Sequence, residues 1–143
     1  MIMHKVFTFF YGSYLNPEVL KEVNIFLDKW EVAKLPGFDI IIKPYANLIK
    51  SSRDSVYGIL TQLTHMELKR LYSHAENVFH ELYEPEAVLI QTADDKWVTA
   101  LCYICHNMNE NNADKNYIDR IIQPAKEYGF PAWYLEKLAS FLK

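Results

Sequence analysis

The segment Tyr11-Gly12-Ser13-Tyr14-Leu15 is the first candidate for chemistry along the chain. It follows the apolar run Val6–Phe10, whose β-branched and aromatic residues predict a buried strand that enters a tight turn. Successive backbone N–H groups in such a turn can form a nest that binds an anion, and Gly12 gives the backbone the freedom to do so. The alternative is a structural turn that only changes the chain direction, because Gly-Ser turns are common.

Glu76 is the second candidate. It lies among the apolar residues Ala75, Val78 and Phe79. Desolvation by apolar neighbours raises the pKa of a carboxyl group in general, and such a carboxyl can act as a base near neutral pH. We therefore expect Glu76 to be partly buried. The opposing interpretation is a solvated surface glutamate, which is the common state of this residue type.

Other combinations of reactive residues do not match a known chemistry. Cys102 and Cys105 form a C-x-x-C pattern, but residues three apart on a strand point to opposite faces, so we expect ordinary core cysteines without a disulfide. The spacing of His74, Glu76 and His80 matches no metal-site pattern. The chain also lacks the glycine motifs that bind nucleotides. The sequence therefore predicts neither a metal nor a cofactor.

The hydrophobic and turn patterns predict an α+β fold, because strands and helices alternate at irregular spacing. The expected strands lie near residues 5–10, 38–42, 55–60, 83–91 and 97–105, and the expected helices near 17–27, 65–74, 115–128 and 131–141. Trp30–Ala33 is also strand-like, and the turn residues Leu35–Gly37 separate it from the next strand. Gly58 lies inside a strand, which indicates a bulge or a close approach of another backbone. Thr64 and Glu67 have the spacing of a capping box.

Composition narrows the class of protein. A chain of 143 residues corresponds to a single domain, residues 1–143. The 15 Lys and Arg residues against 18 Asp and Glu residues, a net charge of −3, argue against nucleic-acid binding. No apolar run is long enough to span a membrane. Two cysteines are too few for a disulfide framework and suit a reducing compartment, so we expect a cytoplasmic protein.

Four segments occur in a characteristic order along the chain. Tyr11–Leu15 follows the first strand, Tyr83 comes seven positions after Glu76, Tyr103 lies in the last expected strand, and Tyr117 begins a helix. In this order the segments resemble the gamma-glutamylcyclotransferase family, which includes AIG2-like domains. The resemblance covers essentially the whole chain, and it implies a mixed, strongly curved, barrel-like β-sheet flanked by α-helices.

The resemblance also implies a reaction. The α-amine of a γ-glutamyl amide would attack its own γ-carbonyl, which releases 5-oxoproline and a free amine. Glu76 would be the catalytic residue, a base toward the α-amine and then an acid toward the leaving nitrogen. The substrate-binding residues would be Tyr11, Gly12, Ser13, Tyr14, Leu15, Tyr83 and Tyr117. The small-molecule γ-glutamyl substrate would be the main partner, without a metal, cofactor, nucleic acid or membrane.

One departure from the family signature keeps a second interpretation open. Tyr14 occupies the position where the signature has asparagine. The chain could therefore be a binding module that holds a small carboxylate-containing molecule without turnover. An enzyme that accepts γ-glutamylamines is a third possibility, because the leaving group would contact the expected loops 44–54 and 106–114. A homodimer is possible, and the sequence does not decide it.

Overall fold

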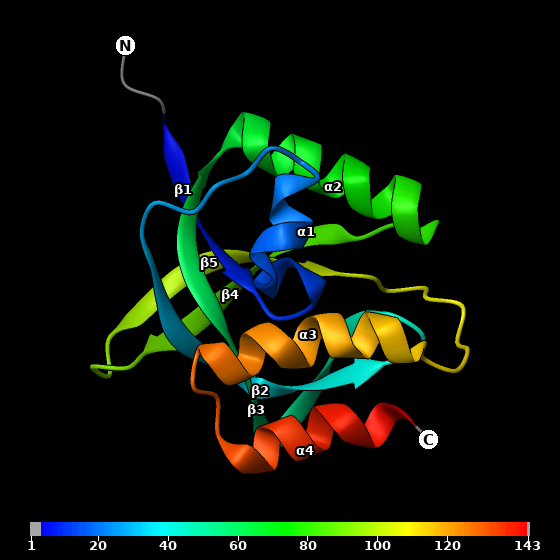
Figure 1. Ribbon diagram of the computed structural model, residues 1–143. Coiled ribbons are helices and arrows are strands. Elements are labelled where there is room, and N and C mark those ends of the chain that lie inside the picture. The colour runs from blue at the N-terminus through cyan, green and yellow to red at the C-terminus, as the bar shows by residue number, and fades with distance from the viewer. Residues whose placement is uncertain (1–3, 143) are drawn as a thin grey trace.

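The centre of the molecule is a closed β-barrel, seen in a computed structural model that describes residues 4–142 (Figure 1). Its strands in that range are β1 (Lys5–Phe10), β2 (Trp30–Ile42), β3 (Ala46–Thr64), β4 (Glu84–Thr92) and β5 (Trp97–Ile104). They follow one another around the barrel in the order β1-β3-β2-β4-β5. Three neighbouring pairs from β1 to β4 and the pair β4–β5 are antiparallel, whereas β1 and β5 pair in parallel at Thr8 and Leu101. The expected α+β fold with a mixed, barrel-like sheet is confirmed.

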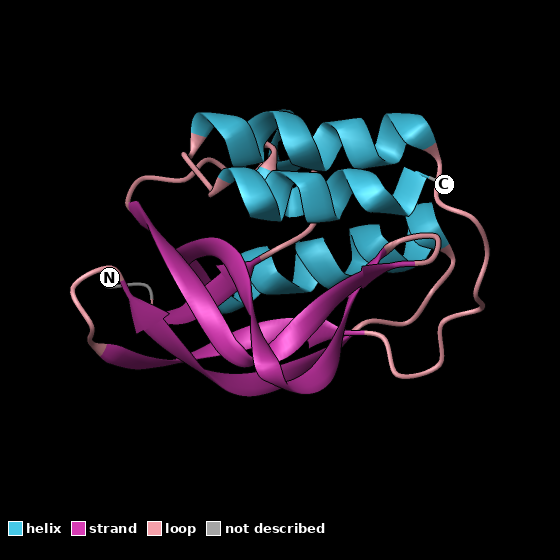
Figure 2. Cartoon of the chain, turned by 90° about the horizontal axis from the view of Figure 1, so that it is seen from below, coloured by secondary structure: helices cyan, strands magenta, loops and turns pink. Residues whose placement is uncertain are grey.

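The helices gather on one side of the barrel, as Figure 2 shows. They are α1 (Pro17–Lys21), α2 (His65–Phe79), α3 (Lys115–Glu127) and α4 (Ala132–Ala139), with 3-10 turns η1 (Ser13–Leu15) and η2 (Ser140–Leu142). No helix of residues 4–142 is long and apolar enough to cross a membrane. Cys102 and Cys105 are both buried and free, as expected for core cysteines.

Strands β2 and β3 are much longer than the sequence pattern indicated. Trp30–Ala33 and residues 38–42 belong to one strand, and residues 46–54, expected as part of a loop, begin β3. The Pro36-Gly37 turn signal corresponds to a register shift between Pro36 and Phe38, with Gly37 at φ +87°. A bulge adds a residue and bends a strand without ending it, which explains why the turn prediction was wrong.

Helix α2 begins where the sequence predicted and ends five residues later. The Glu67 N–H donates to Thr64 Oγ1 at 3.1 Å and the Thr64 N–H donates to Glu67 Oε1 at 2.8 Å, so the capping box is confirmed. The helix continues past Ala75 to Phe79, because no glycine or proline interrupts it, and His80 ends it in the left-handed region at φ 55°. Glu76 therefore lies inside the helix and not after it.

Helix α1 is shorter than the expected helix near 17–27. It begins as predicted, with Asn16 Oδ1 accepting from the Glu18 N–H at 3.0 Å and with Pro17 in the first turn. It ends at Lys21, and Asn24 adopts a left-handed conformation at φ 56°. The chain then runs into β2 without further helix.

Candidate functional site

The Tyr11–Leu15 turn lies at the end of β1 and is buried throughout. The hydroxyl oxygen of Tyr103, in β5, accepts hydrogen bonds from the Gly12 N–H at 3.1 Å and the Tyr11 N–H at 3.4 Å. In return, the Tyr11 hydroxyl donates to the Tyr103 carbonyl at 2.6 Å. The start of the turn is therefore fixed on β5 by three hydrogen bonds.

Gly12 is required for the close packing of this turn. A Cβ atom at Gly12 would lie 2.8 Å from Ala46 Cβ, 3.4 Å from the Tyr103 hydroxyl and 3.9 Å from the Tyr117 hydroxyl. The first of these distances is shorter than real Cβ contacts. The turn thus meets three other segments of the fold at Gly12: the start of β3, the end of β5 and helix α3.

The hydroxyls of Tyr83 and Tyr117 both bind the main chain of Ala46, although the two residues are far apart in the sequence. The Tyr83 hydroxyl donates to the Ala46 carbonyl at 2.6 Å, and the Ala46 N–H donates to the Tyr117 hydroxyl at 2.8 Å. Both phenols therefore hold the Ala46 main chain against Gly12. The structure brings these two tyrosines together with the Gly12 turn.

Two further aromatic side chains, those of Tyr45 and Phe79, pack against Tyr117. The Phe79 ring centroid, from the last turn of α2, lies 4.5 Å from that of Tyr45 and 5.8 Å from that of Tyr117. Tyr45 also packs edge-on against Tyr117 at 5.2 Å. We call Tyr45, Phe79, Tyr83 and Tyr117 the aromatic cover. The contacts of Tyr45 and Phe79 with Tyr117 were not predicted from the sequence, because no local pattern indicates that residues so far apart in the chain meet.

Glu76 is exposed, so the expectation that it is partly buried is wrong. The core-facing positions of α2 include Leu71 and Ala75, and the residue after Ala75 is turned about 100° away from the core. Glu76 lies in the same last turn of α2 as Phe79. It borders a depression of about 430 Å³ whose other lining residues are Asn77, His80, Glu81 and Leu82. The Gly12 turn does not line that depression, so this depression is not the expected single concave site.

The buried phenols of the cover are hydrogen-bonding groups and not bases at neutral pH. Burial raises the pKa of Tyr117 to about 12, although the hydrogen bond from the Ala46 N–H lowers it. Burial, followed by the nearby phenols, raises the pKa of Tyr83 well above its usual value. At neutral pH these two phenols can therefore donate or accept hydrogen bonds but cannot take up a proton as a phenolate would.

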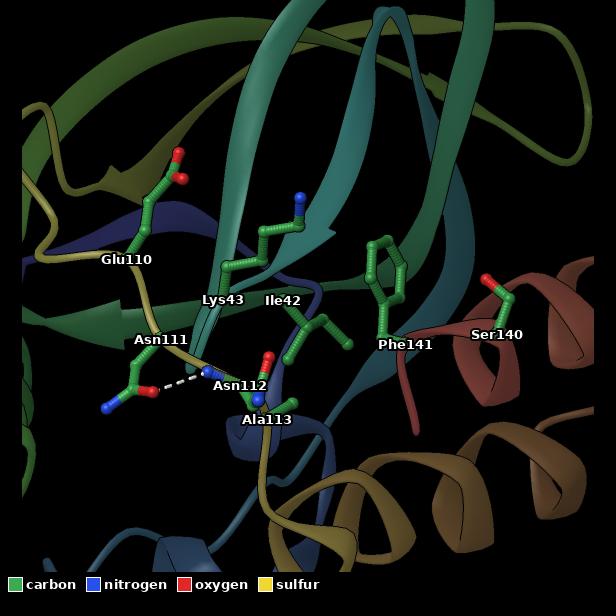
Figure 3. Close-up of a pocket in the computed structure, with 8 residues that line it drawn as sticks. All are labelled: Ile42, Lys43, Glu110, Asn111, Asn112, Ala113, Ser140 and Phe141. Carbon is green, nitrogen blue, oxygen red and sulfur yellow. Dashed lines mark hydrogen bonds between the residues drawn. The ribbon is translucent and has the colours of Figure 1, made fainter. Parts of the chain in front are cut away.

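A separate depression of about 370 Å³ opens between the end of β2, the 106–114 loop and η2 (Figure 3). Figure 3 shows Lys43 and Glu110 at one end and Phe141 and Ser140 at the other, with the Asn112 N–H donating to Asn111 Oδ1 at 2.8 Å. Neither the Gly12 turn nor Glu76 lines this depression. In the part of the chain that the structure describes, no cluster of His, Cys, Asp or Glu residues could hold a metal ion.

The Tyr103 hydroxyl gives a first testable prediction. Tyr103→Phe removes the acceptor of two buried N–H groups and leaves them unpaired, which should lower the free energy of unfolding by about 2 kcal/mol. Urea denaturation followed by circular dichroism measures this loss. Tyr57→Phe is the matched control, because Tyr57 is only half-buried, and an equal loss in both variants would contradict the anchoring role of Tyr103.

Comparisons with known proteins agree with this architecture. The sequence signature described as the AIG2-like family matches residues 55–138. A solved structure named gamma-glutamyl cyclotransferase is 26% identical, with a TM-score of 0.82 over 96% of this chain and 88% of that chain. An uncharacterized protein from Homo sapiens is 25% identical, with a TM-score of 0.80 over 95% of this chain and 87% of that chain. No curated protein matches the sequence.

A more distant structure shares the fold alone. It is a yeast gamma-glutamyl cyclotransferase described as specific to glutathione, and it is 9% identical, with a TM-score of 0.66. The match covers 96% of this chain and 95% of that chain. The barrel with its flanking helices is therefore maintained across very different sequences.

Proposed function

We propose that this chain, which belongs to the AIG2-like family, converts γ-glutamyl amides to 5-oxoproline and a free amine. The observation that carries this proposal is the buried Gly12 turn, enclosed by tyrosine hydroxyls at the end of the barrel where Phe79 of α2 packs against Tyr117. Glu76 lies in the same last turn of that helix. The likeness to a structure named gamma-glutamyl cyclotransferase supports the same reaction. The fold alone would not select it, since one fold hosts many activities.

In the proposed mechanism the substrate supplies its own nucleophile. Glu76 takes a proton from the substrate's α-ammonium, and the free amine attacks the γ-carbonyl carbon to form a five-membered ring. Negative charge develops on the γ-oxygen, where N–H groups at the start of η1 stabilise it, because the first N–H groups of a helix have no acceptor within the helix. Protonated Glu76 then gives its proton to the leaving nitrogen as the C–N bond breaks. The attacking nitrogen still carries one proton more than the ring amide needs, and the Glu76 carboxylate takes this proton and passes it to the amine, which leaves as an ammonium ion. The ring closure consumes no water, and the carboxylate is restored at the end.

Substrate entry requires the aromatic cover to open. Tyr83 and Tyr117 hold the N–H and the carbonyl of Ala46, and these are the same two groups that an amide substrate offers. A γ-glutamyl amide that displaces the Ala46 main chain would find both phenols already oriented toward an amide. Phe79 would move with the last turn of α2, which also carries Glu76. Opening would thus bring the carboxylate and the turn into contact with one molecule.

Release of 5-oxoproline tests the proposal directly. The purified protein is incubated with γ-glutamyl-alanine, with a γ-glutamyl alkylamine and with α-glutamyl-alanine, and 5-oxoproline is measured by chromatography. We expect release from a γ-glutamyl compound and none from the α-linked isomer, whose amine cannot close the same ring. Absence of release from every γ-glutamyl compound would refute the enzymatic function.

A binding module is the second candidate, and the exposed position of Glu76 favours it. A binder needs no carboxylate beside an anionic ligand, so the turn and the two phenols would suffice. It would bind 5-oxoproline or a γ-glutamyl amide, measured by calorimetry, without producing any change in that molecule. Binding without turnover would favour this candidate over the enzyme.

A further inference from the structure

We propose that His74 is a positioning residue for the cyclisation, because it fixes the Gly12 turn against helix α2 through the hydroxyl of Tyr14. The inference rests on the proposed function and adds to it a residue outside the aromatic cover. His74 lies in α2, two positions before Glu76. A group that ties the turn to this helix also sets the distance between the turn and the carboxylate.

The contact between Tyr14 and His74 is well defined. The Tyr14 hydroxyl lies 3.0 Å from His74 Nδ1, and the two rings meet edge-on with centroids 5.9 Å apart. Tyr14 is only 1% exposed, and its ring also packs edge-on against Tyr103 at 5.6 Å. A buried phenol needs a hydrogen-bond partner, so losing His74 leaves this hydroxyl poorly paired. The Tyr14 side chain therefore connects the anchored turn to α2.

His74 is in turn held in place by charged groups of two other helices. Its Nε2 atom lies 3.1 Å from Glu22 Oε1, just after α1, and Arg120 of α3 contacts Glu22 Oε2 at 2.8 Å. Partial burial raises the pKa of Glu22, but the hydrogen bonds from Arg120 and His74 outweigh this effect and keep the pKa below its usual value. Glu22 is therefore a carboxylate that can only accept hydrogen bonds.

The Glu22 carboxylate determines which ring nitrogen of His74 carries the proton. Because Glu22 accepts from Nε2, the proton of a neutral ring is on Nε2, and Nδ1 accepts from the Tyr14 hydroxyl. The Tyr14 hydroxyl also lies 3.4 Å from the Leu71 carbonyl oxygen, which belongs to α2 as well. Both contacts of the Tyr14 hydroxyl therefore join the turn to α2, and the one to His74 is the shorter.

The turn is consequently held at three points. Tyr103 binds its start at Gly12, His74 binds its middle through Tyr14, and the Tyr128 hydroxyl donates to the Leu15 carbonyl at 3.2 Å. Only the middle point lies on α2. Breaking it should leave the turn folded while it loosens the geometry between the turn N–H groups and Glu76.

Steady-state kinetics of 5-oxoproline release test this inference. Tyr14→Phe and His74→Leu should each lower kcat about tenfold with KM nearly unchanged, because a small misplacement affects the transition state more than substrate binding. The double variant should be no slower than either single variant, since both changes break one link. Losses that multiply in the double variant, or a normal kcat in His74→Leu, would overturn the proposal.

Conservative replacements at the same position keep the test independent of folding. The amide of His74→Asn ends near the place of Nδ1 and can accept from Tyr14, so this variant should recover most of kcat. The amide of His74→Gln ends near Nε2, toward Glu22, and should not recover it. Equal rates in the two variants would contradict the role of the Tyr14 link, and melting curves confirm that both are folded.

His65→Gln serves as the control for general effects on α2, because His65 is exposed at the start of the same helix. It should leave kcat unchanged. The possible failures are distinguishable. If the unmutated protein releases no 5-oxoproline, the proposed function and this inference both fail, whereas an active protein with an active His74→Leu variant removes the inference alone.

Discussion

Glu76→Gln should lower the rate of 5-oxoproline release by about 10²–10⁴-fold, the usual contribution of a general acid–base group. Glutamine keeps the size of the side chain and can donate and accept hydrogen bonds, but it cannot take the proton from the α-ammonium. The loss should appear in kcat, because proton transfer belongs to the chemical step. Rates are measured with γ-glutamyl-alanine at several pH values.

The exposed position of Glu76 makes its structural effect easy to separate from its chemical effect. An exposed side chain without a buried partner should change the free energy of unfolding by less than about 0.5 kcal/mol when it is replaced. Melting curves of the two proteins should therefore coincide. Glu84→Gln is the matched control, since Glu84 is exposed at the start of β4 and carries the same charge. A Glu76→Gln protein as active as this control would exclude Glu76 from the mechanism.

The parts of the fold that could be predicted are those with strong local patterns. The strand at 5–10 and the strands near 83–91 and 97–105 lie within one residue of their observed bounds. Strands β2 and β3 could not be delimited in this way, because Pro36-Gly37 and the polar residues 51–54 are typical of turns. Pairing along the whole β2–β3 ladder overrides these local preferences.

The residues of the candidate site could be predicted from the sequence, but their contacts and their exposure could not. The resemblance to a family grouped the Gly12 turn, Tyr83 and Tyr117 in one expected site. In the structure these three lie around Ala46. The exposure of Glu76 was not predictable from its apolar neighbours, because that depends on how far α2 continues. Tyr14 was expected to be a substrate-binding residue and was also a departure from the family signature. Its hydrogen bond to His74 needs a pairing of residues that only tertiary structure reveals.

Gly58 connects the barrel to the site more closely than its place in the sequence suggests. A Cβ atom at this position would overlap the Phe10 carbonyl oxygen and would lie 2.6 Å from Phe9 Cζ. Phe10 is the last residue of β1 and directly precedes the Tyr11–Leu15 turn. The sequence prediction of a close approach at Gly58 is therefore confirmed, and the backbone that approaches it is the one that leads into the site.

Gly58→Ala should lower the free energy of unfolding by about 3 kcal/mol or more, because the extra methyl group meets a backbone oxygen that cannot rotate away. In a domain of this size that corresponds to a fall in Tm of roughly 10 °C. Ser55→Ala, in the same strand, should change stability by less than about 0.5 kcal/mol. Urea denaturation of the three proteins measures both values. If β1 can move away from Gly58 without loss of stability, Gly58→Ala and Ser55→Ala will unfold at the same urea concentration, and the prediction is wrong. If they cannot, Phe10 must shift, and residual 5-oxoproline release from the folded fraction should fall along with stability.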